Sequence, residues 1–381
     1  MANQKSARYE NLIQHVKNDI AKGDYYGLVL KVTRGDDVVF HEVIGAEDAK
    51  QTQPLKLDSV FSIFSMTKAF TNVLALSAVE HGRLALTTRV SDIIPEFSGA
   101  PRDKITLFHL LTHMSGLPSV WTPKAGMYED QLDELVEAVV ANVHGVNNPG
   151  ERCHYSPICN HVLMGEMIRR TDPLGRGFRD IMHQDLFEPL GMSDTALGVS
   201  SHMRTRKVVP DLRGVVPIEV KGRTMPGPHS LFEEPVNDAP HHGASSTVND
   251  ISRFATMLRQ GGELDGSRIL SPRILEMARQ NWTGDKVNEL YRGVALKFGW
   301  DVPPAYYGLG FGVRGDGIIH HQLGTMTSPE TFGNHGAGST LFWVDPKLDM
   351  TFSCLSAGIM TQGDNIERFQ RISDIVVSMV D

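Results

Sequence analysis

Cysteine is scarce in this chain of 381 residues, and the three that occur are Cys153, Cys159 and Cys354. They form no C-x-x-C pair and no Cys/His spacing of the kind that binds zinc. Their small, odd number also argues against a disulfide framework. The chain therefore depends on an ordinary apolar core, which its length and its 41% of apolar residues can supply.

Long apolar runs and a strong positive charge are lacking too. No stretch approaches the roughly 18 consecutive apolar residues that a membrane-spanning helix needs, and residues 1–13 contain no apolar segment typical of a secretory signal. Lys and Arg number 37 against 45 Asp and Glu, a net charge of −8, and the charges are scattered along the chain. We therefore expect a cytoplasmic protein without a membrane or nucleic-acid partner.

Strand patterns occur near both ends of the chain. Residues 27–32 and 38–44 are rich in β-branched residues and flank the turn residues 34–37, which is typical of a β-hairpin. Residues 339–344 and 350–355 repeat this pattern around a second turn. The two hairpins predict one antiparallel sheet assembled from both termini.

Helical patterns accompany the hairpins and fill the middle of the chain. Residues 4–22 and 364–380 carry apolar positions at helical spacing. A third segment, 64–81, is apolar on nearly every side, which indicates a buried helix, and a shorter helix is expected at 131–143. The sequence thus predicts an α+β fold in which an antiparallel sheet flanked by helices carries a large, mainly helical insertion.

Ser65-Met66-Thr67-Lys68 lies at the start of the buried helix, and Ser65 is the only serine with a lysine three positions later. Residues three apart share one face of a helix, so the Lys68 amine can reach the Ser65 hydroxyl. Burial would lower the pKa of the lysine and make it a usable base, and the helix start offers free N–H groups to a developing anion. The alternative is a helix-capping serine and a lysine that extends to solvent.

Tyr155 follows a turn and precedes a helix expected near residues 160–169. A tyrosine close to Lys68 could pass the proton that leaves Ser65 on to a departing group. Taken alone, a tyrosine in this position is as compatible with simple packing.

Residues 332–339, Phe-Gly-Asn-His-Gly-Ala-Gly-Ser, are glycine-rich and lead directly into a strand. Glycines at a strand edge let a ligand approach backbone N–H groups, so this segment could supply one donor of an oxyanion hole. Without the other motifs it would be only a turn.

Together these motifs resemble those of the serine β-lactamase-like hydrolases, which include class C β-lactamases, DD-peptidases and the family VIII carboxylesterases, and the pattern is most similar to the last. The resemblance extends over about residues 25–360 in the family's order. It is carried by 61–68 with Ser65-Met66-Thr67-Lys68, 105–118, Pro149-Gly150-Glu151-Arg152 with Tyr155-Ser156, 186–192, 243–247 with Asp250, and 335–338 before Asp345-Pro346.

The resemblance implies that Ser65 is the acylated nucleophile, Lys68 its base partner and Tyr155 the proton shuttle. It implies the β-lactamase/transpeptidase-like fold. Residues 1–62 and 290–381 would form the lobe with the sheet, and residues 63–289 the mainly helical lobe. The active site would lie in the cleft between them.

The resemblance also implies an oxyanion hole made by the backbone N–H groups of Ser65 and of a residue after Gly336. If Gly336 is the glycine of the family's K-T-G triplet, Asn334 takes the place of the lysine and His335 that of the threonine. Ala337 would then be the second N–H donor. A shift of this alignment by one residue stays open, because many relatives carry a histidine in the triplet.

Two departures from the family pattern favour an esterase over a β-lactamase. The asparagine of the family's Y-x-N motif, which contacts the amide side chain of a β-lactam, is Pro157 here and has no donor. The triplet lysine that holds a β-lactam carboxylate is replaced by neutral Asn334 or His335. Both changes weaken recognition of an anionic amide and leave Ser65, Lys68 and Tyr155 intact.

No metal or organic cofactor is expected. The adjacent pairs His241-His242 and His320-His321 would have diverging side chains in a strand, so we expect polar surface or loop histidines. Residues 310–315 satisfy G-x-G-x-x-G, yet no helical pattern or acidic partner follows, as a nucleotide site requires.

The leading hypothesis is a serine hydrolase that cleaves small carboxylic esters through an acyl-enzyme on Ser65 and could also transfer the acyl group. One alternative is a β-lactamase or D-amino-acid peptidase or amidase. Another is a catalytically inactive relative that only binds a ligand. The natural ester, its acyl chain length and stereochemistry, and the oligomeric state stay open.

Overall fold

A six-stranded antiparallel sheet built from both ends of the chain organises the molecule. The computed structural model describes residues 2–210, 219–220, 223–224 and 237–380. The strand order is β10-β11-β12-β13-β1-β2, so β1 near the N-terminus pairs with β13 near the C-terminus. The strands are β1 (Gly27–Arg34), β2 (Asp37–Gly45), β10 (Gly312–Val313), β11 (Phe332–Gly336), β12 (Thr340–Asp345) and β13 (Met350–Ala357).

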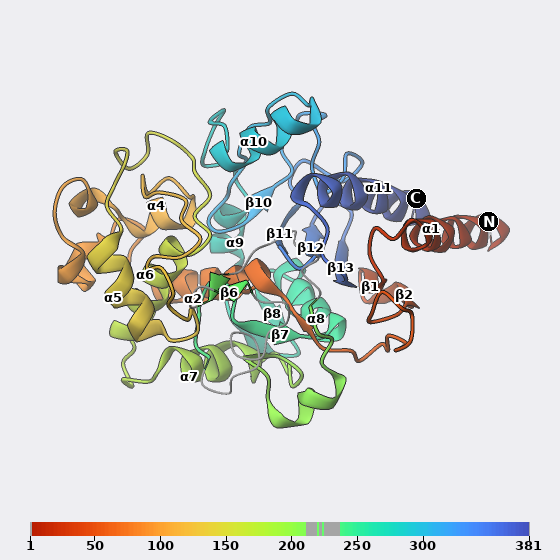
Figure 1. Cartoon of the computed structure of the whole chain (residues 1–381), viewed down its shortest axis with the longest axis horizontal. Coiled ribbons are helices and arrows are strands. Elements are labelled where there is room, and N and C mark those ends of the chain that lie inside the picture. Colours follow the sequence, from red (N-terminus) through yellow and green to blue (C-terminus); the bar gives the residue numbers. More distant parts are fainter. Residues whose placement is uncertain (1, 211–218, 221–222, 225–236, 381) are drawn as a thin grey trace.

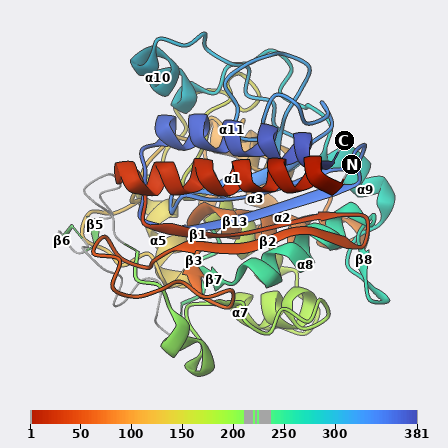
Figure 2. The same ribbon diagram turned by 90° about the vertical axis from the view of Figure 1, so that its right-hand side faces the viewer.

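Helices cover both faces of this sheet. The two terminal helices, α1 (Ala2–Lys22) and α11 (Gln362–Val380), lie side by side on one face, and α8 (Val248–Arg259) packs on the other, as Figure 2 shows. Strand alternation explains both contacts: along β12, Trp343 points into the core beneath α1 and α11, whereas Phe342 points into the core on the α8 side. The predicted sheet, its two hairpins and its flanking terminal helices are confirmed.

Several of the remaining helices gather around α2 (Thr67–Glu80), which is buried along nearly its whole length (Figure 1). Because α2 is apolar on every side, it must be enclosed, and α6 packs against it while α4 and α5 pack against α6. The helices not yet given are α3 (Val90–Ile93), α4 (Leu107–Leu111), α5 (Leu132–Asn142), α6 (Cys159–Arg170), α7 (Phe178–Met182), α9 (Pro272–Ala278) and α10 (Glu289–Phe298), and of these α10 packs on α11.

Short strands join the helical part to the rest of the chain. Three of them form a small sheet in which β7 pairs with both β3 and β4. This pairing fixes the segment just before α2 against residues almost 200 positions later. The short strands are β3 (Phe61–Ser62), β4 (Ala196–Leu197), β5 (Glu219–Val220), β6 (Arg223–Thr224), β7 (Ala244–Ser246), β8 (Glu263–Leu264) and β9 (Ser267–Arg268).

The division into lobes at residues 62/63 and 289/290 stays a prediction. One helix of the inserted part, α8, packs on β1, β12 and β13 of the main sheet. The insertion and the sheet therefore share a continuous apolar core. Among the described residues, no helix combines the length and apolarity needed to cross a bilayer.

Candidate active site

Ser65 lies in a tight turn at the entrance to α2. Residues Phe64–Met66 form a single 3₁₀ turn, and Thr67 begins the α-helix. Phe64 has a φ of +50°, a left-handed conformation that is strained for a bulky residue and that the packed segments on either side must maintain. Phe64 and Met66 are buried while Ser65 is partly exposed, so the turn presents the serine hydroxyl.

Lys68 lies within hydrogen-bonding distance of Ser65, as its spacing predicted. Its Nζ is 3.0 Å from Ser65 Oγ, and it also donates to the backbone carbonyl oxygen of His241 at 2.8 Å. The side chain is only 1% exposed. Burial holds the pKa of the Lys68 amine well below its usual value, and the nearby Glu129 carboxyl acts in the opposite direction. A desolvated amine of this kind can accept a proton from the serine.

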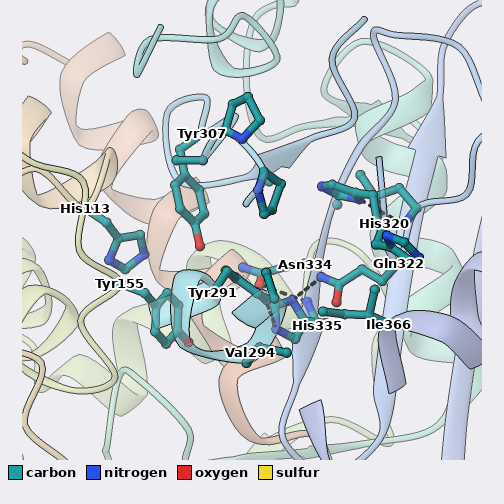
Figure 3. A pocket seen from close by; sticks show the side chains of 18 of the residues that line it. His113, Tyr155, Tyr291, Val294, Tyr307, His320, Gln322, Asn334, His335 and Ile366 are labelled. Carbon is teal, nitrogen blue, oxygen red and sulfur yellow. Dashed lines mark hydrogen bonds between the residues drawn. The ribbon is translucent and has the colours of Figure 1, made fainter. Parts of the chain in front are cut away.

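Tyr155 completes a three-residue cluster with Ser65 and Lys68. Burial raises the pKa of the Tyr155 phenol to about 12, and a hydrogen bond with Ser65 opposes that rise. Lys68 Nζ lies 5.5 Å from the centroid of the tyrosine ring, and the His113 ring packs beside it at 4.7 Å (Figure 3). Because the phenol is protonated near neutral pH, Tyr155 is suited to relay a proton, whereas Lys68 is suited to remove one.

The end of β11 approaches the Ser65 turn closely at Gly336. A Cβ added to Gly336 would overlap the Ile63 carbonyl oxygen, and Thr340 Oγ1 donates to that same oxygen at 3.2 Å. Ala337 is the first residue of the turn that follows β11. The structure thus brings the segment after Gly336 next to the turn that carries Ser65, which suits the predicted oxyanion donor.

Replacing Gly336 by alanine should push β11 away from the Ser65 turn, because the new methyl group meets backbone atoms that cannot rotate aside. We expect a loss of stability of about 1–3 kcal/mol, as for other overpacked sites, together with reduced turnover. Thermal unfolding and ester hydrolysis would be compared with Gly293→Ala, where a Cβ meets no atom within 4 Å. Equal unfolding temperatures for the two variants would contradict this close approach.

Asn334 and His335 line a cavity beside Lys68 and Tyr155, whereas Gly336 and Ala337 lie outside its lining. His335 Nε2 is 2.8 Å from the Tyr291 hydroxyl, and its Nδ1 is hydrogen-bonded to the Gln322 amide (Figure 3). Burial lowers the pKa of His335 to about 3. The ring is therefore neutral and held in one orientation, and it supplies no positive charge to a bound anion.

Sequence analysis missed the residues that complete this cavity. They come from α10 and the irregular segment 300–323, where no motif or periodicity marks them, and they include Tyr291, Trp300, Tyr307 and Gln322. His113, which lies in the matched segment 105–118, also lines the cavity, and its Nδ1 accepts a hydrogen bond from the Ser156 backbone N–H. Only contacts between distant segments could have identified these side chains.

The histidine pairs were predicted to be polar surface or loop residues, and His241 does lie in a loop, the turn before β7, but it is fully buried there and not at the surface. The chain here is a turn and not a strand, so the His241 and His242 side chains do not diverge: their ring centroids are 3.8 Å apart. In the other pair, His320 is exposed and stacks on Trp300 at 4.2 Å. Burial lowers the pKa of His242 to about 3 and raises that of the neighbouring Glu129 to about 8.

Comparison with known proteins agrees with this geometry. A family profile described as Beta-lactamase matches residues 12–376. Protein Rv1367c of Mycobacterium tuberculosis (strain ATCC 25618 / H37Rv) is 27% identical over 361 residues, covering 85% of this chain and 84% of that protein.

Two solved structures share the fold. A penicillin-binding protein homologue from Caulobacter crescentus superposes with a TM-score of 0.76 at 22% identity, covering 98% of this chain and 97% of the other. A family VIII carboxylesterase superposes with a TM-score of 0.78 at 16% identity, with the same coverage.

Proposed function

Because this chain belongs to the beta-lactamase family, we propose that it is a serine hydrolase that cleaves small, uncharged carboxylic esters through an acyl-enzyme on Ser65. The observation that carries the proposal is the 3.0 Å contact between Ser65 Oγ and a lysine amine whose pKa burial holds well below its usual value. A capping serine and a solvent-reaching lysine would not meet in this way, since Lys68 is 1% exposed.

In the proposed acylation, the neutral Lys68 amine takes the proton of Ser65 as Oγ attacks the ester carbonyl carbon. Backbone N–H groups of Ser65 and Ala337 would stabilise the resulting oxyanion. Collapse of this intermediate breaks the bond to the alcohol, whose oxygen receives the phenolic proton of Tyr155, and the Lys68 ammonium returns a proton to the tyrosine. Water then attacks the acyl-enzyme by the reverse proton path, releasing the acid and restoring Ser65.

The cavity lined by Lys68 and Tyr155, the two residues that contact Ser65, favours an uncharged substrate. Among the described residues that line it, Lys68 is the only lysine, arginine, aspartate or glutamate. Burial lowers the pKa of His113 to about 3 and that of His321 to about 4, so these lining histidines are neutral as well. Apart from Lys68, a β-lactam carboxylate would find no ion-pair partner among these residues, and Pro157 offers no donor to its amide side chain.

The test compares two chromogenic substrates, one an ester and the other a β-lactam. We expect steady turnover of p-nitrophenyl butyrate, slow or no turnover of a chromogenic cephalosporin, and an intact-mass increase equal to the acyl group when the reaction is quenched early. Preferential cephalosporin turnover would favour the β-lactamase or peptidase alternative. Absence of both turnover and adduct would favour an inactive binding relative.

Tyr155→Phe should slow acylation by roughly 10²-fold, because the leaving alkoxide loses its positioned proton donor. The effect should shrink for esters with better leaving groups, which need less protonation. Pre-steady-state release of the corresponding phenol from each of a series of substituted phenyl esters would measure it. Tyr25→Phe is a matched control, since Tyr25 is a fully buried tyrosine of the sheet core. A Tyr155→Phe rate equal to that of the control would remove Tyr155 from the mechanism.

A further inference from the structure

Glu129, His241 and His242 bring three metal-binding side chains together beside Lys68. Their ligand atoms all lie within 4.8 Å of one another. The two imidazole rings meet edge to face, with planes inclined by 79°. Glu129 comes from the loop before α5, and the histidines come from the turn before β7, so the cluster joins two segments that are distant in sequence.

Burial distinguishes this cluster from ordinary surface histidines. His241 is 0% exposed, and neither of its ring nitrogens has a hydrogen-bond partner among the described residues. Glu129 is 4% exposed. Buried polar atoms are nearly always satisfied, so a neutral imidazole without a partner beside a buried carboxyl indicates a ligand that supplies the missing interaction.

We propose that Glu129, His241 and His242 bind one divalent transition-metal ion of the zinc type. Two imidazole nitrogens and one carboxylate oxygen form a mixed donor set that suits zinc, cobalt or nickel, whereas magnesium and calcium prefer oxygen ligands alone. The ligand atoms need to move little to enclose an ion, because they already share one small volume.

The place of this site in the fold indicates a positioning role. Backbone contacts already hold the two segments together: Asp238 N donates to Asp130 O at 2.9 Å, and Leu132 N donates to Asp238 Oδ1 at 2.6 Å. The His241 carbonyl oxygen accepts the hydrogen bond from Lys68 Nζ. An ion on the His241 ring would therefore fix the carbonyl that orients the Lys68 amine, while taking no part in bond making at Ser65.

The experiment uses the untagged full chain, stripped with EDTA and titrated with Co²⁺ and Zn²⁺. We expect one ion per chain by elemental analysis after desalting. We also expect visible cobalt absorption without a thiolate charge-transfer band, because the three cysteines lie outside the cluster. Glu129→Gln and His242→Asn should each weaken metal binding by about 10²-fold. Loss of a residue that only supports a metal ligand costs about 10- to 100-fold in affinity, so loss of a ligand should reach at least the upper end of that range.

The double variant His320→Asn/His321→Asn is the matched control, because it removes the other adjacent pair, and it should keep the full metal content. Circular dichroism checks that each variant folds; if one does not, the stoichiometry and cobalt spectrum of the unmodified chain decide the question. The proposal of a metal site would be overturned if the unmodified chain bound the metal ion no more tightly than Glu129→Gln does. A thiolate charge-transfer band in the cobalt spectrum would overturn it as well. Ser65→Ala should bind the ion unchanged, so failure of the metal site and failure of the esterase proposal are distinguishable.

Discussion

Ser65→Ala is expected to lower ester turnover by about 10⁴-fold or more and to abolish the acyl adduct seen by intact mass. The variant removes the only atom that the mechanism acylates, and losses of this size follow removal of a nucleophile in serine hydrolases. Lys68 keeps its second hydrogen bond to the His241 carbonyl, and the serine is partly exposed, so the fold should be unaffected. Burst kinetics with p-nitrophenyl butyrate, together with the mass spectrum, measure both effects.

Ser353→Ala is the control for this experiment, because it deletes a buried serine hydroxyl of β13 without touching the cavity. It should retain wild-type turnover and the adduct. An acyl adduct that persists in Ser65→Ala, or turnover close to that of the control, would show that another residue is acylated and would end the proposal.

Local spacing accounts for the part of the site that sequence could predict. Ser65 and Lys68 are three residues apart at the start of one helix, so a single turn of backbone fixes their contact. The apolar character of 64–81 also predicted the burial that depresses the Lys68 pKa. These inferences needed no information about the rest of the chain.

The positions of Tyr155 and of the segment after Gly336 could not be predicted from local spacing alone. Their proximity to Ser65 depends on how the helical part packs on the sheet, which no spacing encodes, and only the family resemblance indicated it. In the structure no side chain fits between Gly336 and the Ile63 carbonyl, while the alignment of Gly336 with the family's triplet stays a prediction.

The cavity and the histidine cluster lay beyond prediction because they are assembled from irregular segments. Tyr291 and Gln322 meet at His335 from α10 and a loop. His241 was predicted to be a surface or loop residue because adjacent side chains diverge in a strand, yet the turn before β7 is enclosed between α2 and the loop that carries Glu129. In each case tertiary packing decides the environment, and composition gives no warning of it.

Lys68→Met should lower acylation by roughly 10³-fold while leaving the fold intact. Methionine has nearly the length of lysine and packs well in an apolar site, but it cannot accept a proton. The variant therefore removes the base and changes little else. Its unfolding temperature should stay within a few degrees of the wild type, because the cost of burying the Lys68 amine offsets the hydrogen bonds that the amine makes. Single-turnover release of p-nitrophenol and thermal unfolding, measured on the same samples, test both parts.

Lys31→Met supplies the comparison, since Lys31 is a half-buried lysine whose pKa burial also lowers, and it contacts Asn249 and not Ser65. If burial of a lysine mattered only for stability, the two variants would change unfolding alone and both would hydrolyse esters normally. If Lys68 is the base, only Lys68→Met loses the acylation step. Substrate affinity should then be the same in Ser65→Ala and in the double variant Ser65→Ala/Lys68→Met. Near-normal acylation in Lys68→Met would therefore remove the lysine from the mechanism, whatever the effect on stability.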